Sequence, residues 1–505
     1  MKSTFGYLVG LALFLTLSPA AQASYITDIG YDSLKAQLGS STPTGVGIRV
    51  TQVEAPESNS SSGQPIFMPN PSHPEFAGKT ITPVGGNPTG LFSGHATEVG
   101  RLLYGTNSIA YGMTQVASYE ANSWLNSLTT ASGTASASLD RVANHSWIGG
   151  SGTNAGVIGN ALRSVDLQVT LNEYIQVAAM SNGPSDSPLL GGSAYNVISV
   201  GRTDGAHQQG SVAVSGDSQY GVTGRTAPTL VVPQGVTSTA TPVVAAAAAI
   251  LVQTGHEGGL TLSEGSRIVE GVGTIYNAEQ SETVKAALMA GADRQTANTT
   301  LGGGDITDYR SAGHETVNGL DSRYGAGQLN IYNSYRILAG GEQRSAQNAG
   351  GDIRSTGFDY GSIGGPNGTG HTASYFFNTT GSELSLFASL VWNLDVANTS
   401  IFNAVPPATK LYNLDLSLFD VTNNRLVATS ASLIDNTENL YFKLLLGHRY
   451  EMRVTTNEST PWDYALAWRI DANAAPVPIP PTAWLFVTGA LGLLLATRAM
   501  KVRHP

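Results

Sequence analysis

The feature that most constrains the fold is the alternation of short apolar runs with helix-like runs between residues 45 and 340. Buried strands are predicted at Val46–Val53, Ile175–Ala179 and Asn196–Val200, and helices at Thr241–Val252 and Ser281–Ala290. Strands that alternate with helices are typical of a parallel sheet covered by helices. The sequence therefore predicts an α/β region built on a mostly parallel sheet flanked by helices.

The pattern changes after residue 371, where apolar and polar residues alternate with a period of two. Turn-forming residues separate these segments, which is typical of an all-β sandwich. Residues 341–370 are rich in Gly, Ser and Asn and are predicted to form a linker between the two regions. The sandwich is predicted over residues 371–472, with strands at Leu384–Leu390, Asn413–Val421, Leu440–Leu446, Tyr450–Val454 and Tyr464–Ile470.

Composition excludes several classes of function. The chain has 505 residues, 26 Lys and Arg against 36 Asp and Glu, and a net charge of −10 without any basic block. Nucleic acid is therefore not expected as a partner, because binding it requires positive charge to neutralise phosphates. The absence of cysteine excludes disulfides, cysteine-ligated zinc, iron–sulfur clusters and thiol nucleophiles.

The first 23 residues have the layout of a secretory signal peptide. Lys2 supplies the positive start, Tyr7–Leu17 is the apolar core, and Ala21-Gln22-Ala23 is a small-x-small cleavage site. A membrane anchor is the alternative, but the apolar run is shorter than the roughly 20 residues that span a bilayer. We expect cleavage before Ser24, export of the chain by the secretion machinery, and a first folded domain over residues 24–340.

The last 30 residues, 476–505, form a second targeting segment. Four prolines precede an apolar run at Thr482–Thr497, and three basic residues follow it, which predicts a single transmembrane anchor with a cytoplasmic end. The proline motif Val477–Pro480, the apolar run and the basic tail together resemble the PEP-CTERM sorting signal of Gram-negative bacteria, although Ile479 stands where that signal often has Glu. The resemblance implies processing by an exosortase, a transient inner-membrane anchor, and a final location at the cell surface or in the extracellular matrix.

Two segments carry residue types suited to nucleophilic chemistry. Ser238 follows a glycine-containing turn and opens an alanine-rich helix, where free N–H groups and the helix dipole could bind an oxyanion. Taken alone, this segment also fits a serine that caps the helix. His95 lies at the start of a second predicted helix, and histidine suits general-base catalysis near neutral pH.

Two further polar residues follow predicted strands. Glu54 ends the strand Val46–Val53, at the kind of strand end where sites of open α/β sheets assemble, and it could orient a histidine. Asn182 follows the strand Ile175–Ala179 and could donate a side-chain N–H to an oxyanion. A surface carboxylate and a turn asparagine are the ordinary alternatives for these two residues.

The order Glu54, His95, Asn182, Ser238 is the order of a subtilisin-type triad. Val236–Pro242 is similar to the serine motif Gly-Thr-Ser-Met-Ala-Thr-Pro of the subtilisin-like serine proteases, and His95–Arg101 is similar to their histidine motif. The chain thus resembles that family over roughly residues 45–337. Further resemblances lie at His73–Gly78, Asn144–Gly150, Ala178–Asn182, Tyr195–Gly201, Val284–Met289 and Tyr324–Asn330.

The resemblance implies a serine endopeptidase that hydrolyses peptide bonds with catalytic Glu54, His95 and Ser238 and an oxyanion hole at Asn182. It also implies a strand that binds an extended peptide or protein substrate. No cofactor is required, although the family often binds structural calcium, for which the sequence shows no site. Leu414–Asp420, Tyr450–Val454 and Asp463–Trp468 resemble the pre-peptidase C-terminal domains of secreted proteases. The substrate strand contributes Ser146, Trp147 and Gly149.

Several positions depart from the family pattern. Glu54 replaces Asp and is one methylene longer, while Ala96, Ser181 and Val236 replace glycines. These departures leave a second interpretation open, in which the chain is a weak or inactive protease scaffold that acts as a surface or matrix binding protein. A third interpretation, an acid protease of the sedolisin type with a Glu base, conflicts with the histidine motif at His95.

Overall fold

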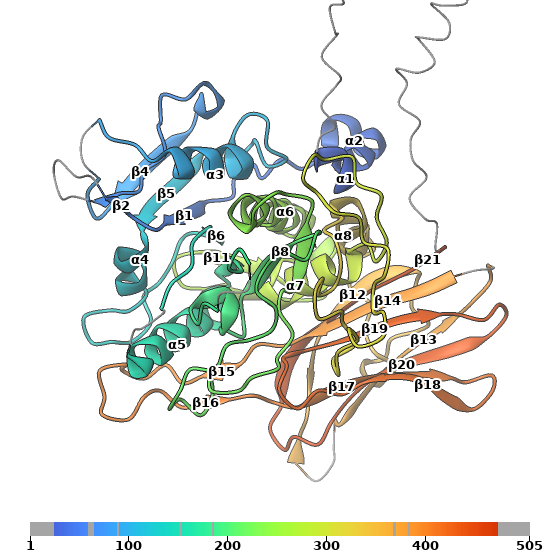
Figure 1. The fold of residues 1–505 in the computed structure, drawn as a ribbon. Helices are drawn as coiled ribbons and strands as arrows, with labels where there is room; N and C mark the ends of the chain where they lie inside the picture. The colour runs from blue at the N-terminus through green and yellow to red at the C-terminus, as the bar shows by residue number, and fades with distance from the viewer. Residues whose placement is uncertain are drawn as a thin grey trace, which may run out of the picture.

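The computed structural model describes residues 25–58, 65–87, 90–150, 154–183, 186–366, 370–381 and 384–472. The predicted signal peptide and the predicted sorting segment, residues 1–23 and 476–505, lie outside the described residues. The described part contains one seven-stranded sheet surrounded by helices, followed along the chain by two four-stranded antiparallel sheets (Figure 1). The predicted fold class is therefore confirmed.

The large sheet is parallel throughout, with strand order β4-β5-β1-β6-β7-β8-β9. All carboxyl ends of its strands therefore meet at one edge, and β1 lies in the interior of the sheet. The strands are short, buried and rich in Val, Ile and Ala, as expected where helices cover both faces. Their bounds are β1 Val50–Glu54, β4 Thr80–Val84, β5 Gln115–Glu120, β6 Val142–His145, β7 Ile175–Ala179, β8 Ile198–Arg202 and β9 Leu230–Val232.

Side chains alternate between the two faces of this sheet and define two apolar layers. Val50, Val142 and Val177 pack with α6 and α7, whereas Val53 and Ala143 pack with α4 and α5 on the other face. Short helices α1 and α2 precede the sheet and lie near α8 (Figure 1). The bounds are α1 Tyr25–Asp28, α2 Tyr31–Leu38, α3 Gly94–Tyr104, α4 Ala121–Ser127, α5 Ala155–Asn172, α6 Thr237–Gly258, α7 Ser281–Gly291 and α8 Ile331–Ala339.

Helix α6 runs through the middle of the α/β part and contacts β6, β7, β8 and β9 (Figure 1). Its five consecutive alanines favour helix and, being small, allow close approach to the sheet. Among the described residues, Thr237–Leu262 is the one segment long and apolar enough to cross a membrane, and 89% of its most apolar stretch is buried inside the protein. This segment is therefore the core helix of the fold.

The C-terminal part is a sandwich of two antiparallel sheets, with orders β12-β21-β14-β19 and β13-β20-β17-β18. One apolar core fills the space between them and contains Tyr375, Trp392 and Trp468. The main strands are β12 Thr356–Ile363, β13 Thr372–Asn378, β14 Leu384–Val391, β17 Leu414–Asp420, β18 Arg425–Ser430, β19 Thr437–Lys443, β20 Arg449–Thr456 and β21 Trp462–Ala472. Two-residue strands are β2 Glu57–Ser58, β3 Pro65–Ile66, β15 Asp395–Val396 and β16 Thr409–Lys410, and β10 Ser266–Val269 pairs with β11 Gly273–Tyr276.

The prediction of a linker over residues 341–370 is wrong for its central segment. Strand β12 occupies Thr356–Ile363 and pairs along its whole length with β21. The glycines and Ser362 in this strand obscure its apolar alternation, but Phe358 and Ile363 are buried. At Gly357 and Gly361 an added Cβ would meet the side chains of Gln343, Trp468 and Tyr464, so glycine here reflects close packing and does not indicate a flexible chain.

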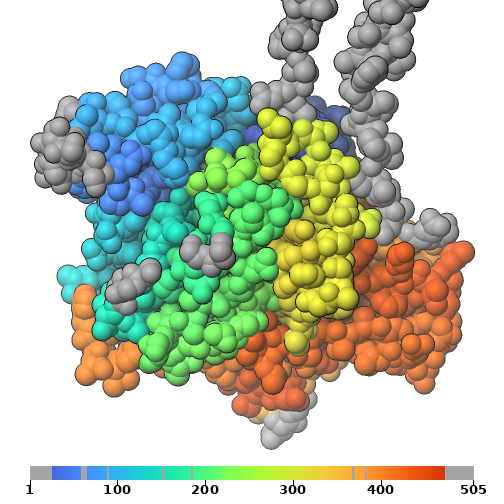
Figure 2. All heavy atoms as spheres, viewed as in Figure 1, coloured from blue at the N-terminus to red at the C-terminus, as the bar shows by residue number. Residues whose placement is uncertain are grey.

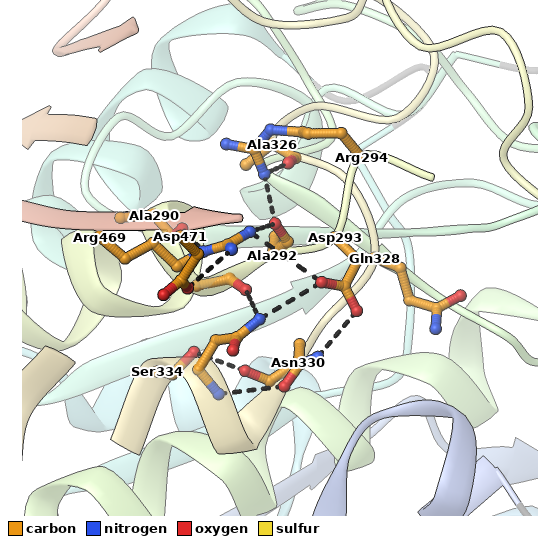
Figure 3. A network of polar contacts seen from close by, with 12 residues as sticks. Ala290, Ala292, Asp293, Arg294, Ala326, Gln328, Asn330, Ser334, Arg469 and Asp471 are labelled. Atoms are coloured by element: carbon orange, nitrogen blue, oxygen red, sulfur yellow. Dashed lines mark hydrogen bonds and ion pairs between the residues drawn. The ribbon is translucent and has the colours of Figure 1, made fainter. Parts of the chain in front are cut away.

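The sandwich packs directly on α7 and α8. Strands β14 and β21 contact α7, and Figure 2 shows the orange and red residues of the sandwich lying against the yellow residues near 300–340. Arg469 on β21 is 6% exposed and donates to the carbonyl oxygens of Ala290 (2.9 Å) and Ala292 (3.0 Å), where α7 ends (Figure 3). A buried cation at this place satisfies carbonyl groups that the helix leaves unpaired.

Candidate active site

Glu54 is the last residue of β1 and is 1% exposed. Its Oε2 lies 2.8 Å from Nδ1 of His95, so the longer side chain of Glu reaches the imidazole. His95 lies in the first turn of α3, and Ser93 caps this helix by accepting a hydrogen bond from the N–H of Ala96 at 2.9 Å. The strand end and the helix start therefore bring the predicted carboxylate and histidine together.

The environment of the pair favours a charged imidazole. The hydrogen bond with Glu54 raises the pKa of His95 and is the largest influence on it, while burial acts in the opposite direction. Burial also raises the pKa of Glu54, against the effect of the hydrogen bonds from His95 and Gln52. Glu57 adds negative charge near both groups and raises both pKa values. A histidine whose imidazolium form is stabilised in this way suits a general base.

Ser238 lies in the first turn of α6 and is half-buried. Four residues later, Pro242 has no N–H, so the carbonyl of Ser238 lacks the usual helical partner. The hydroxyl of Ser146 fills this place and donates to that carbonyl oxygen at 2.9 Å. Ser146 itself accepts from Asn144 Nδ2 at 3.0 Å. The proline and the serine together fix the start of α6 against the end of β6.

Asn182 follows β7 and contacts the same helix start. Its Oδ1 accepts from the backbone N–H of Thr237 at 2.9 Å and from the Thr237 hydroxyl at 3.1 Å. Because the oxygen end of the carboxamide is held in this way, the NH₂ end is the one that remains to donate. The structure thus places Asn182 against Thr237, the residue before Ser238, at the N-terminus of α6, where the helix dipole is positive.

The predicted residues form two hydrogen-bonded groups at the carboxyl edge of the sheet. In one group Glu54 contacts His95, and in the other Asn182 contacts Thr237, the residue before Ser238. Helices α3 and α6, which carry His95 and Ser238, pack against each other. Within the part of the chain that the structure describes, no hydrogen bond joins His95 to Ser238, and the imidazole side chain is 45% exposed.

No protein-family model matches the chain, and no curated protein matches it. Among solved structures, the prenylagaramide maturation protease PagA is 18% identical, with a TM-score of 0.36, over 61% of this chain and 98% of that chain. The self-cleaved protease domain of PatA is 16% identical, with a TM-score of 0.35, over 59% of this chain and 99% of that chain. The pre-peptidase C-terminal domain of a Bacillus anthracis collagenase is 16% identical, with a TM-score of 0.16, over 22% of this chain and 87% of that chain.

The predicted substrate strand after β6 is partly engaged within the protein. Ser146 and Trp147 are 4% and 8% exposed, so their side chains do not line an open groove. Gly149 exchanges hydrogen bonds with the hydroxyl of Ser187, its N–H at 3.1 Å and its carbonyl at 2.9 Å. Among the described residues, no backbone hydrogen bond involves Trp147 or Ile148, so their peptide groups are the ones available to an extended peptide.

Sequence reasoning missed two polar residues that support the dyad, Gln52 and Tyr104. Gln52 donates to Glu54 Oε1 at 2.8 Å and accepts from the hydroxyl of Tyr104 at 2.6 Å. A signal for Gln52 was present, because it precedes Glu54 by two residues on a strand and therefore lies on the same face. No comparable signal marked Tyr104, which lies at the far end of α3 from His95.

A third missed residue, His145, ends β6 one residue before Ser146 and is completely buried. Burial lowers the pKa of this histidine to about 4, and its Nε2 lies 2.7 Å from Gln176 Oε1. It is therefore neutral at physiological pH and does not act as a cation in the site. Across the described residues, no group of three or more His, Cys, Asp or Glu side chains could hold a metal ion, and structural calcium stays a prediction.

Proposed function

We propose that this chain is a subtilisin-like serine endopeptidase that hydrolyses peptide bonds with Glu54, His95 and Ser238. The observation that carries the proposal is the buried Glu54 carboxylate held on Nδ1 of a half-exposed imidazole. This arrangement leaves Nε2 of His95 to accept a proton. It lies at the sheet edge that also carries Ser238 and Asn182, the two other groups that acyl transfer requires.

In the proposed reaction, Nε2 of His95 takes the hydroxyl proton of Ser238 while Oγ bonds to the carbonyl carbon of the substrate. The negative oxygen that forms is stabilised by the NH₂ of Asn182 and the backbone N–H of Ser238. The peptide C–N bond then breaks as His95 returns the proton to the leaving amine. Water attacks the acyl-enzyme by the same route in reverse and releases the new carboxyl group.

Glu54 has the role that Asp has in most such triads. It holds the imidazole in one orientation and balances the charge that forms when His95 is protonated. The extra methylene does not prevent this contact, because Oε2 lies 2.8 Å from Nδ1. No cofactor enters the reaction, and the partner is a peptide or protein substrate.

The decisive experiment is labelling with a fluorophosphonate, which reacts with activated serines. A protein of residues 24–475 is treated with the probe, and mass spectrometry locates the label. Wild type should be labelled on Ser238, and Ser238→Ala should not be labelled. Asn182→Ala should slow labelling about 100- to 1,000-fold, and Glu54→Gln should slow it on the order of 10⁴-fold. A folded wild type that takes no label at neutral or acidic pH would exclude the proposed activity.

An inactive binding scaffold is the second candidate, favoured by the missing hydrogen bond between His95 and Ser238. The two candidates differ in one measurement. A scaffold would bind extended peptides equally well in the wild type and in Ser238→Ala, and neither would release cleaved product. A labelling rate that is highest at acidic pH would instead favour a Glu base of the sedolisin type.

We also propose that the protein is exported and then anchored briefly through its C-terminal segment before it reaches the cell surface or matrix. The support lies in the sequence of the two ends. N-terminal sequencing of the mature protein should begin at Ser24. A mature chain that begins at Met1, or that stays in the cytoplasmic fraction, would contradict export.

A further inference from the structure

Gln52 is a buried amide whose hydrogen-bonding groups are all used at the candidate site. It lies on β1, is 0% exposed, and shares a face of the strand with Glu54. Its Nε2 donates to Glu54 Oε1 and to the carbonyl oxygen of Ala96, both at 2.8 Å. Its Oε1 accepts from the hydroxyl of Tyr104 at 2.6 Å. Buried polar groups are costly when unpaired, so this amide has one favourable orientation.

The chemistry of the partners fixes that orientation. The carbonyl of Ala96 can only accept a hydrogen bond, and so can an ionised Glu54. Turning the amide around would place its oxygen against two other oxygens, which excludes the alternative. Gln52 therefore presents an N–H to the carboxylate in every arrangement compatible with these neighbours.

The same amide links both members of the dyad. Glu54 uses Oε2 for His95 and Oε1 for Gln52, so each carboxylate oxygen has one donor. Ala96 follows His95 directly, and its carbonyl is the second acceptor of the Gln52 NH₂ group. Gln52 thus holds the carboxylate and the start of α3 at a fixed separation, which matters because Glu has one more rotatable bond than Asp.

Tyr104 supports the amide from the other end of α3, and the packing around it is tight. Tyr104 is 0% exposed. A Cβ added at Gly100 would lie 2.5 Å from the Tyr104 hydroxyl and 3.0 Å from Phe76. The lack of a side chain at Gly100 therefore leaves the space in which the Tyr104 hydroxyl reaches Gln52.

We propose that Gln52, supported by Tyr104, is a positioning residue that aims the Glu54 carboxylate at His95 and keeps it ionised. This proposal rests on the proposed function of the dyad. Without the amide, Oε1 of Glu54 would be buried without a donor, and the carboxylate would take up a proton more readily. A neutral Glu54 stabilises the imidazolium of His95 less, so the pKa of His95 would fall toward its ordinary value.

The test compares Gln52→Leu and Tyr104→Phe with wild type by the pH dependence of fluorophosphonate labelling. A hydrogen bond to a charged group corresponds to a factor of about 10 to 100, so Gln52→Leu should slow labelling about 10- to 100-fold at pH 7. The midpoint of the acidic limb should move to lower pH. Tyr104→Phe should shift both quantities less and in the same direction, and the double variant should match Gln52→Leu because Tyr104 acts through Gln52.

Gln168→Leu is the matched control. Gln168 is a buried glutamine on α5 that likewise donates to two carbonyl oxygens, those of Leu128 (2.6 Å) and Ser136 (3.0 Å), away from the site. Its variant should lose comparable stability with no change in the labelling rate or in its pH dependence. All variants are compared at a temperature where circular dichroism shows each of them folded.

A second measurement separates this proposal from the proposed function. The pKa of the His95 imidazole is measured by NMR titration in protein labelled at histidine, with assignment by His95→Gln. It should fall in Gln52→Leu and stay unchanged in Gln168→Leu, whether or not the wild type takes the label. A folded Gln52→Leu protein with the wild-type His95 pKa would overturn the positioning role, while an unlabelled wild type would overturn only the peptidase activity.

Discussion

Replacing Arg469 by methionine should destabilise the whole described fold, although Arg469 lies more than 200 residues from Ser238. The guanidinium is buried, and it donates to the carbonyls of Ala290 and Ala292 at the end of α7. Its Nη1 also lies 3.3 Å from Asp471, and the group stacks 3.6 Å above the ring of Phe387. Methionine fills a similar length and keeps the apolar contact while it removes every donor.

The size of the effect follows from these contacts. Each hydrogen bond from a charged group contributes about 1.5–3 kcal/mol, so two lost bonds give about 3–6 kcal/mol. Removing the buried charge returns part of this, because its desolvation was unfavourable in the folded state. We expect a net loss of about 3–5 kcal/mol in the free energy of unfolding, in the range found when one partner of a buried pair is removed.

The assay is urea denaturation of a protein of residues 24–475, monitored by tryptophan fluorescence and by circular dichroism. Arg449→Met is the control, because Arg449 pairs with Asp352 at the surface, and exposed pairs contribute about 1 kcal/mol or less. Wild type should unfold in one transition that both probes report. A loss below about 1 kcal/mol in Arg469→Met, or separate transitions for the α/β part and the sandwich in wild type, would refute the reasoning.

Three further predictions concern stability. Burial lowers the pKa of Lys285 to about 8, so between pH 8 and 10.5 the unfolded chain binds a proton that the folded chain lacks. The free energy of unfolding of wild type should therefore rise across this pH range relative to that of Lys285→Met. Burial lowers the pKa of His207 to about 4, so between pH 6.5 and 4 this histidine is protonated only in the unfolded chain. The free energy of unfolding should therefore fall by about 3 kcal/mol across this range. Urea titrations of His207→Gln should show a smaller decline. Gly325 has φ +54°, and an added Cβ would overlap the carbonyl oxygen of Pro228. Gly325→Ala should therefore lose about 2–4 kcal/mol in the free energy of unfolding. A thermal midpoint equal to that of wild type would contradict this.

The sequence was sufficient for elements whose pattern is set by burial alone. Strand β7 occupies Ile175–Ala179 as predicted, because a continuous apolar run fits a strand covered on both faces. Helix α6 begins at Thr237 and ends at Gly258, longer than the predicted Thr241–Val252. Residues distant in sequence contact its polar ends: Asn182 accepts from Thr237, and Gln253 accepts from the backbone N–H groups of residues 44 and 45. Strand β12 was missed because its glycines fit against aromatic side chains from elsewhere in the chain, which no local pattern reveals.

The candidate site also contains contacts that the sequence predicts and contacts that it does not. Glu54 and His95 were predicted to be partners from their order and from the ends of their elements, and the structure brings them to 2.8 Å. The link between Ser146 and the carbonyl of Ser238 could not be predicted, because it joins the residue after β6 to α6 across 92 residues. The hydrogen bond from Gln52 to Glu54 could be predicted from their two-residue spacing on a strand. The hydrogen bond from Tyr104 that orients Gln52 could not, because only the fold brings Tyr104 close to it.

The place of β21 in the fold has a consequence for the time at which the protein is completed. The ribosome makes the chain from its N-terminus, and Arg469, one of the residues that donate to the carbonyls at the end of α7, is made late. Strand β21 is also the last of the sandwich, yet it lies between β12 and β14 in the interior of its sheet. A nascent chain that stops short of β21 therefore lacks a closed sandwich, and at the end of α7 it has the donors of Arg294 and Asn333 but not those of Arg469.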